Sequence, residues 1–412
     1  MALLLRLLFA FLTWHPDVNN HVDWGTRFWD YGAKNFYTAN VWSYTWPNQP
    51  PGTVYIYAGL KKQYDFIHSI FWYINVNVPT FPSNLIFYLE SNLYPALLKL
   101  PSIFADFGIA YLIYKSISDK NKARLGAVLW LLNPVIWYNS SLWGQTDSLI
   151  SFFVFLAFYL LTKKKPVLSV LLFALSIYIK ASLLIFIPIY ILLFISKKFP
   201  IGIYFKSIIL SLLLVIVLTI PFSKGNPVVW LYYLYQGKVF VQQLQVITAN
   251  AFNIWATIAS IHERPQSLNL GPFTYQLWGT VLFVVSYAVL VISFFKSKTR
   301  NLFWLLSMIA FSSFMLMTNM HERYLFPFFP FFTVIAVTDK KLLKLYLLIS
   351  LISLLNLYNF WWFPKISVVV NFLSFADRLM PRVLGFVMFI SYLILFRYFL
   401  LQTRTSKINY RD

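Results

Sequence analysis

Residues suited to chemistry gather directly after the first apolar segment of the chain. Asp17 follows that segment, and His21, Asp23 and Trp24 come shortly after it. An ionisable group beside a membrane-embedded cavity is costly to keep there, so it is a candidate for a functional site by default. A carboxylate in this position can act as a general base, and Asp17 is the first candidate for that role.

Two further interpretations of this stretch stay open. Asp23 and Asp30 compete with Asp17 for the role of base, unless one of them caps a helix or pairs with Arg27. The stretch also holds the oxygen and nitrogen atoms that a metal shell needs, at His15, Asp17, His21 and Asp23.

Charged residues recur at or inside later apolar segments. Lys99 and Asp106 fall on one face of a single apolar helix, and we expect them to form a structural pair. Arg323 offers the paired donors that bind phosphate oxygens; in the other interpretation, the triplet His321-Glu322-Arg323 is an ion pair that fixes a helix end. The similar triplet His262-Glu263-Arg264 precedes no apolar helix and is interpreted as solvated surface.

The composition places the chain among integral membrane proteins. Its 412 residues are 59% hydrophobic, 20% aromatic and 11% charged, far from the usage of soluble domains. Apolar stretches recur along the whole chain, so no polar block is long enough for a separate soluble domain. The absence of cysteine excludes disulfides, cysteine metal sites and thiol nucleophiles.

The hydropathy pattern predicts an all-α membrane protein of about 12 transmembrane helices, folded as a single polytopic domain over 1–412. Several segments are shorter than the roughly 20 residues that cross a bilayer alone. The first segment is expected to be an uncleaved helix rather than a signal peptide. The expected helices are Ala2–Thr13, Tyr94–Tyr114, Ala123–Tyr138, Leu149–Leu161, Val167–Tyr178, Ala181–Ile195, Ile203–Ile220, Thr280–Phe295, Leu302–Met317, Tyr324–Val337, Leu342–Tyr358 and Val383–Leu401.

The distribution of charge predicts the orientation. The net charge is +21, and the short basic loops all fall on one side of the expected helices, which is the cytoplasmic side by the positive-inside rule. Both termini are then cytoplasmic. Asp17, Asp147, Glu322 and all five histidines fall on or near the opposite face, so any chemistry is expected to be extracytoplasmic. Nucleic acid is the weaker explanation for the basic charge.

Three long outer segments, 14–92, 221–279 and 359–382, are expected on that opposite face. Long loops in a compact protein tend to be functional. The first two segments are rich in tryptophan and tyrosine. Such segments suit interfacial helices that lie along lipid headgroups, which is the favoured interpretation, and they also suit stacking surfaces for sugar rings.

Several motifs together resemble a known family. A carboxylate just outside the first helix, Trp24 after it and the turn Pro50-Pro51 resemble the GT-C superfamily of polyprenyl-phosphate-sugar-dependent glycosyltransferases. The resemblance is to the dolichyl-phosphate-glucose glucosyltransferases of N-glycan assembly and to bacterial proteins similar to the second mannosyltransferase of the GPI pathway. The further motifs, in the same order as in the family, are Asn133-Pro134, Trp143-Gly144-Gln145-Thr146-Asp147-Ser148, Lys180 with Pro188, and His321-Glu322-Arg323-Tyr324-Leu325 with Pro327.

The resemblance implies a role for each matching residue. Asp17 would be the catalytic base of an inverting transfer, because one carboxylate is enough for inversion. His321, Arg323 and Lys180 would bind the phosphate of the donor. Gln145 and Asp147 would hydrogen-bond the sugar, or Asp147 would cap the helix that follows. The remaining residues assigned to sugar or acceptor binding are Trp24, Asp23, His21 and Glu322.

The resemblance also implies the reaction and its partners. A hexose, mannose or glucose, would move from a dolichyl or undecaprenyl phosphate sugar to a lipid-linked or cell-surface glycan. No metal and no other cofactor are expected to be required. Low Ala and Gly with high Lys, Ile, Phe and Asn favours a prokaryotic plasma membrane. Arg323, where the family commonly has Lys, and Thr-Asp after Gln145 favour the bacterial relatives.

Two alternatives from other classes remain at this stage. A transporter or flippase of lipid-linked sugars can have the same number of helices with both termini inside. Related halves and polar residues near the midplane are typical of transporters, and neither is evident in this sequence. A structural subunit of a larger membrane complex is the second alternative. No motif specifies the sugar, the acceptor, the linkage or the oligomeric state.

Overall fold

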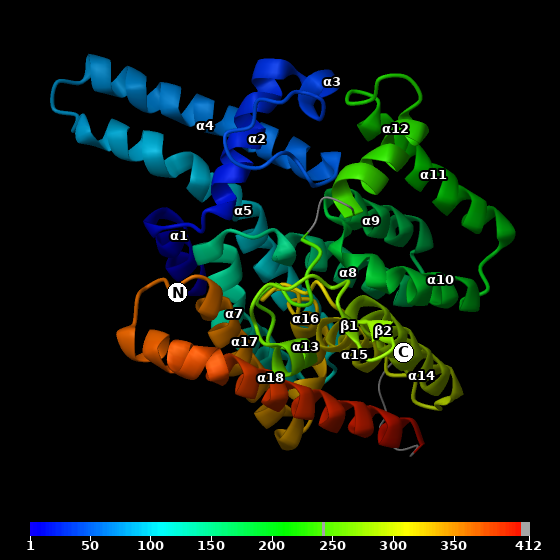
Figure 1. The fold of residues 1–412 in the computed structure, drawn as a ribbon. Coiled ribbons are helices and arrows are strands. Elements are labelled where there is room, and N and C mark those ends of the chain that lie inside the picture. Colours follow the sequence, from blue (N-terminus) through cyan, green and yellow to red (C-terminus); the bar gives the residue numbers. More distant parts are fainter. Residues whose placement is uncertain (241–243, 405–412) are drawn as a thin grey trace. The chain divides into compact units, whose positions relative to one another are not determined.

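The protein is all-α, as expected from the sequence. The computed structural model describes residues 1–240 and 244–404, and nearly all of its regular structure is helical (Figure 1). The strands within the described residues are β1 (Asn269–Leu270) and β2 (Phe273–Thr274), a short antiparallel pair in which Asn269 lies opposite Thr274.

Several helices can cross a membrane. Each of the twelve expected apolar segments overlaps a helix, but within the described residues five helices are long and apolar enough to span a bilayer by themselves. The number of spans that the shorter helices add stays a prediction. The five are α5 (Asn84–Ser116), α11 (Ile201–Thr219), α14 (Tyr275–Lys296), α17 (Lys340–Phe360) and α18 (Ser367–Arg404).

The chain folds as two compact units, each built from separate segments. Unit 1 comprises 1–108, 137–184 and 194–243, and unit 2 comprises 109–136, 185–193 and 244–412. The chain passes between units inside α5, α7 (Pro134–Trp137), the 3-10 helix η2 (Ala181–Phe186) and α10 (Ile187–Ser196). The expectation of one polytopic domain stays a prediction.

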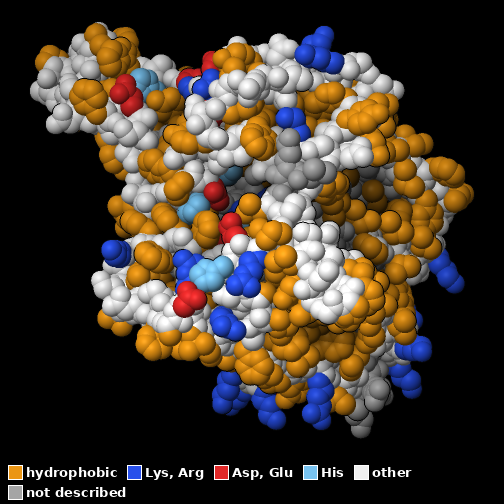
Figure 2. Space-filling model, in the orientation of Figure 1, with side chains coloured by type: hydrophobic (Ala, Val, Ile, Leu, Met, Phe, Trp, Pro, Cys, Tyr) orange, Lys and Arg blue, Asp and Glu red, His pale blue; other side chains and the backbone are white. Residues whose placement is uncertain are grey.

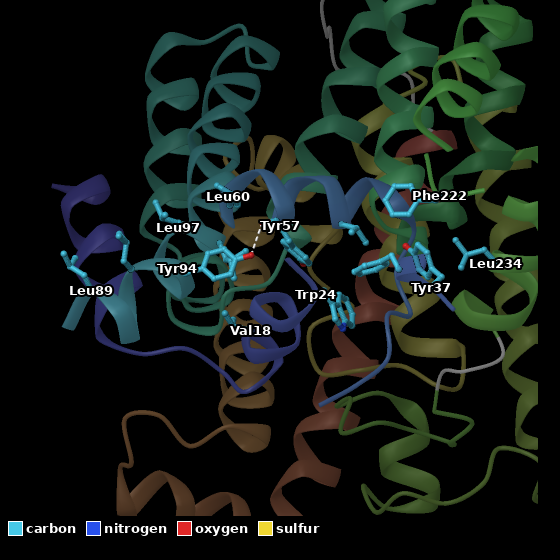
Figure 3. Close-up of a cluster of buried hydrophobic side chains, with 14 residues drawn as sticks. Val18, Trp24, Tyr37, Tyr57, Leu60, Leu89, Tyr94, Leu97, Phe222 and Leu234 are labelled. Carbon is cyan, nitrogen blue, oxygen red and sulfur yellow. Dashed lines mark hydrogen bonds between the residues drawn. The ribbon is translucent and has the colours of Figure 1, made fainter. Parts of the chain in front are cut away.

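The other helices of unit 1 surround its core. They are α1 (Ala2–Leu12), α2 (Asp17–Tyr31), α3 (Ala33–Phe36), α4 (Pro51–Asn77), the π-helix η1 (Tyr138–Trp143), α8 (Asp147–Thr162), α9 (Pro166–Ile179), α12 (Pro227–Leu234) and η3 (Tyr235–Phe240). Figure 3 shows part of this core, where Val18 and Trp24 of α2 lie near Tyr57 and Leu60 of α4.

Unit 2 contains α6 (Lys120–Leu132), α13 (Ile254–Ala259) and α14 to α18, including α15 (Leu302–Leu316) and α16 (Phe328–Ala336). Almost every residue of α15 and α16 is buried. The hydroxyl of Tyr392 ties α18 to this core through Ser286 at 2.8 Å and Ser312 at 3.1 Å. The short apolar helices α15 and α16 are therefore surrounded by protein within unit 2, which explains how helices too short to cross a bilayer alone are accommodated.

Three boundaries differ from the sequence-based expectation. The helix expected from Tyr94 begins ten residues earlier, at Asn84, because the polar residues Glu90, Ser91 and Asn92 interrupt the apolar pattern just before Tyr94. The segment expected from Tyr324 becomes helical at Phe328, because Pro327 starts that helix. The long first outer segment, 14–92, is mostly helical, since α2 and α4 alternate polar and apolar residues and hydropathy alone does not detect them.

The start of α4 packs very closely on the end of α9. The hydroxyl of Thr53 donates to the carbonyl of Ile179, so α4 holds the chain immediately before Lys180. A Cβ atom at Gly52 would lie 2.6 Å from the carbonyl oxygen of Tyr178. Glycine at this position therefore allows the two backbones to meet.

We predict that Gly52→Ala destabilises the protein by about 1–3 kcal/mol, because the added methyl group forces α4 away from α9. Gly59→Ala is the matched control in the same helix. Gly59 is exposed with nothing near its Cβ position, so alanine there should raise stability by about 0.5–1 kcal/mol. Thermal unfolding in detergent, followed by intrinsic fluorescence, measures both. Equal midpoints for the two variants would contradict the close contact.

Candidate active site

The carboxylate of Asp17 accepts hydrogen bonds from two side chains and stays partly exposed. Asp17 begins α2, and its Oδ2 accepts hydrogen bonds from Gln145 Nε2 at 2.7 Å and from Trp143 Nε1 at 3.3 Å. The side chain keeps 31% of its accessible surface. The structure therefore brings together two predicted site residues, Asp17 and Gln145, that lie 128 positions apart.

His15 completes this side of the site. Its Nδ1 accepts a hydrogen bond from the backbone N–H of Asp17 at 3.1 Å and lies 3.3 Å from Oδ1 of the same residue. Its ring stacks on the indole of Trp143 with centroids 4.3 Å apart. Asp17 is thus contacted by His15, which precedes it in the chain, and by Trp143 of η1.

Gly144 allows Gln145 to reach the carboxylate. It ends η1 with φ of +92°, and the backbone N–H groups of Gly144 and Gln145 both donate to the carbonyl of Asn139. A Cβ atom at Gly144 would lie 2.6 Å from the side chain of Val18. Both the left-handed backbone and the lack of space therefore require glycine here.

Asp147 and Lys180 form a buried ion pair in the same unit. Lys180 Nζ donates to Asp147 Oδ1 at 2.6 Å, and Asn139 Nδ2 donates to Oδ2 at 3.2 Å. Both charged residues are at least nine-tenths buried. Thr146 is the N-cap of α8 and no side-chain hydrogen bond caps this helix, so the capping role considered for Asp147 is not observed. The predicted contact of Lys180 with a donor phosphate stays a prediction.

Tyr57 contacts the predicted site residue His21, and the sequence analysis did not identify it. It is fully buried, its ring stacks on His21 at 4.4 Å, and its hydroxyl makes no hydrogen bond within the described residues. Burial raises the pKa of Tyr57, and so do Tyr94 and the carboxylates of Asp147 and Asp17. The phenol therefore stays protonated near these carboxylates. A tyrosine in an amphipathic helix gives no sequence signal for such a role.

Asp23 and Trp24 are engaged within the protein. Arg27 Nε donates to Asp23 Oδ1 at 2.6 Å, and the backbone N–H of Ser43 donates to Oδ2 at 3.0 Å. The alternative that Asp23 pairs with Arg27 is thus confirmed. Trp24 is buried, and its indole N–H donates to the carbonyl of Thr45 at 2.8 Å. Their predicted contacts with sugar or acceptor remain untested.

A metal shell is not assembled from these side chains. Within the described residues, no three histidine, aspartate or glutamate side chains converge closely enough to hold a metal ion. Asp23 is paired with Arg27, and Asp30 is exposed at the far end of α2. The prediction that no metal is required stays a prediction.

Buried charges fix the segments that carry the site. The expected pairing of Lys99 with Asp106 is wrong. Lys99 Nζ instead donates to three backbone carbonyls, those of Ala10 at 3.1 Å, Ser141 at 2.9 Å and Thr13. Its ammonium is satisfied by carbonyls because the end of α1 leaves such acceptors unpaired.

Asp106 pairs with Arg6 of α1. The carboxylate accepts from Arg6 Nε at 3.0 Å, Ser140 Oγ at 2.7 Å and Ser148 Oγ at 2.6 Å. All four residues are fully buried. The sequence analysis did not assign a role to Arg6, because every other residue of α1 is apolar and the segment is classified by its hydropathy alone. Together with Lys99, this network links α1, α5, η1 and α8.

The triplet His321-Glu322-Arg323 belongs to unit 2. Glu322 Oε1 accepts from Arg323 Nη1 at 2.5 Å, and His321 Nδ1 lies 3.9 Å from Glu322 Oε2. The glutamate side chain is fully buried, whereas the arginine keeps 15% of its surface. An ion pair ahead of α16 is thus present. The predicted joint action with Asp17 stays a prediction. His262, Glu263 and Arg264 are exposed, which confirms the solvated interpretation.

No protein-family model matches the chain, and no curated protein matches it significantly.

We predict that Arg6→Met lowers the free energy of unfolding by about 3–5 kcal/mol, because the Asp106 carboxylate stays buried without its cation. The double variant with Asp106→Asn should recover part of this loss, since the amide is uncharged and its one oxygen can still accept from one of the two serines. Lys34→Met, at an exposed lysine of the same unit, is the control and should stay within about 0.5 kcal/mol. Denaturant titration in mixed micelles measures all three. Additive losses in the double variant would argue against the pair.

Proposed function

We propose that this protein is a membrane glycosyltransferase of the GT-C type. It transfers a hexose, mannose or glucose, from a polyprenyl phosphate sugar to a glycan or glycolipid acceptor at the extracytoplasmic face. One observation carries the proposal: the partly exposed Asp17 carboxylate accepts hydrogen bonds from Gln145 and Trp143. These residues come from two separate motifs of the family resemblance, and their meeting supports a shared site.

The reaction follows from the carboxylate. An acceptor hydroxyl donates its proton to Asp17 as its oxygen attacks the anomeric carbon. The bond between that carbon and the phosphate oxygen breaks, and the polyprenyl phosphate leaves with the electron pair. Attack opposite the leaving group inverts the anomeric centre, so one carboxylate suffices. Lys180, His321 and Arg323 are proposed to bind the departing phosphate.

The surroundings of Asp17 suit a base. Gln145 and Trp143 fix the carboxylate, so it need not reorganise as it receives the proton. Because the side chain is partly exposed, it can accept from a hydroxyl group. The phenol of Tyr57 stays protonated at neutral pH, because burial and the nearby carboxylates raise its pKa, and Asp147 is proposed to hydrogen-bond the sugar.

The membrane arrangement is part of the proposal. Five helices already fit a bilayer, and the shorter apolar helices would add the remaining spans up to about twelve. Both termini then lie in the cytoplasm and Asp17 faces outward, by the positive-inside rule. The lipid tail of the donor enters from the bilayer and the acceptor from water.

We predict that Asp17→Asn lowers the rate of sugar transfer by at least about 100-fold, because the amide cannot take the proton. The assay supplies the purified protein with radiolabelled glucose, mannose, galactose and arabinose donors on polyprenyl phosphate, with membrane lipid extract as acceptor. Asp30→Asn is the matched control, since Asp30 is an exposed carboxylate of the same helix and should be close to wild type. Donor binding by the folded Asp17→Asn variant should be retained.

The outcomes separate the classes of function. Loss of transfer in the Asp30→Asn variant with full activity in Asp17→Asn would show that Asp30, and not Asp17, is the base. Movement of intact donor across vesicle membranes, without any cleavage, would replace the enzyme by a transporter of lipid-linked sugars. If the lipid extract gives no product, the test is repeated with native membranes as the source of acceptor.

We predict that Gln145→Glu shifts the acid limb of the pH profile of transfer to higher pH by at least about one unit, because two adjacent carboxylates share a proton. Gln145→Leu has no such charge, so it should lower the rate without moving the limb. Initial rates between mildly acidic and mildly basic pH distinguish the two variants. Unshifted limbs in both would show that Gln145 does not face the base during catalysis.

A further inference from the structure

The hairpin formed by α4 and the first turns of α5 carries an uncharged, apolar tip. Figure 1 shows the two helices side by side, joined by a short loop, within unit 1. No aspartate, glutamate, lysine or arginine occurs from Phe66 to Leu89. Charged side chains stand just outside this stretch, at Lys61, Lys62, Asp65 and Glu90.

The tip exposes large apolar side chains rather than burying them. Figure 2 shows hydrophobic side chains gathered over the end of this hairpin. A water-soluble surface rarely exposes a contiguous patch of this kind without a binding role. The exposed fractions on α4 and its loop are 67% at Phe66, 43% at Ile70, 51% at Trp72, 69% at Tyr73, 65% at Val76 and 42% at Val78, and those on α5 are 67% at Phe87 and 44% at Tyr88.

Charged side chains lie before the tip, aromatic and aliphatic side chains follow them, and the turn carries the uncharged polar residues Asn77, Thr80, Ser83 and Asn84. Lys61 and Asp65 form an ion pair near its base, and Lys62 lies over the ring of Trp29. A groove of about 680 Å³ between the two helices has the His68–Glu90 pair among its lining residues, together with Trp72, Tyr73 and Val76. Polar groups followed by tryptophan, tyrosine and aliphatic side chains match the order of groups from lipid headgroups to acyl chains.

The length of α5 supports the same environment. Its 33 residues extend about 50 Å, which exceeds the roughly 30 Å of a hydrocarbon core. Two thirds of the apolar window of α5 is buried inside the protein, in contrast to the exposed tip. The first turns of α5 therefore expose apolar side chains, whereas most of the apolar window of the same helix is covered by protein.

We propose that the tip of the α4–α5 hairpin, residues 66–89, inserts into the membrane interface and contacts phospholipid acyl chains. A protein partner fits less well, because protein interfaces commonly include arginine and a polar rim, and no charged side chain is available over this stretch. Lys61, Lys62 and Asp65 then lie at the level of the lipid headgroups. This contact does not depend on the proposed transfer of sugar.

The test uses the full-length protein in phosphatidylcholine and phosphatidylglycerol vesicles. The chain has no cysteine, so one introduced cysteine carries an environment-sensitive fluorophore without any background labelling. Tyr73→Cys reports on the tip. Lys62→Cys is the matched control, because it lies three helical turns earlier on the same face of α4 and its side chain is 57% exposed.

We expect nitroxide-bearing lipids to quench the label at position 73 about twofold more than the label at position 62, and iodide in water to show the opposite order. Phe87→Cys on α5 should behave like position 73, which gives a second reading if one variant folds poorly. Equal iodide quenching at positions 62 and 73, without lipid quenching, would overturn the proposal. Shielding of position 73 from both quenchers would also overturn it, in favour of a second copy or another protein.

Discussion

The site depends on one buried cation that satisfies backbone carbonyls from two different segments. The last turn of a helix leaves carbonyl groups without partners, and in an apolar environment each costs free energy. The ammonium group of Lys99 donates hydrogen bonds to the carbonyls of Ala10 and Thr13 at the end of α1, and to the carbonyl of Ser141 in η1. Because α1 leads to Asp17 and η1 leads to Gln145, a single ammonium group fixes both halves of the carboxylate site.

A neighbouring charge extends this constraint from the backbone to the side chains. Asp106 accepts hydrogen bonds from Arg6 and from two serines that flank the Gln145 segment, and all four residues are fully buried. Such a network has few alternative arrangements. The carboxylate of Asp17 then accepts from the uncharged donors Gln145 and Trp143 and stays partly exposed.

The sequence predicted the helical class and the neighbourhood of Asp17 because both follow from local chemistry. Long apolar segments are helical in a membrane, and a carboxylate after such a segment is unusual enough to be noticed. The pairing of Lys99 and Asp106 was predicted wrongly because spacing in one helix does not show what other helices bring to it. Arg6 lay in an apolar run and Tyr57 in an amphipathic helix, and no local pattern reveals a partner 100 positions away.

The separation of Asp17 from its partners also has a consequence for biosynthesis. Gln145 follows Asp17 by 128 positions and Lys180 follows Asp147 by 33, so the chain must be made as far as position 180 before all these contacts can form. At about 5–20 residues per second, the 163 residues from Asp17 to Lys180 (180 − 17) take roughly 8–30 s to synthesise. For the first 128 residues of that interval, the acidic start of α2 has no Gln145 to contact. A charged group that is tolerable in water but costly in lipid therefore helps keep this end of the nascent chain at the membrane surface until the rest arrives.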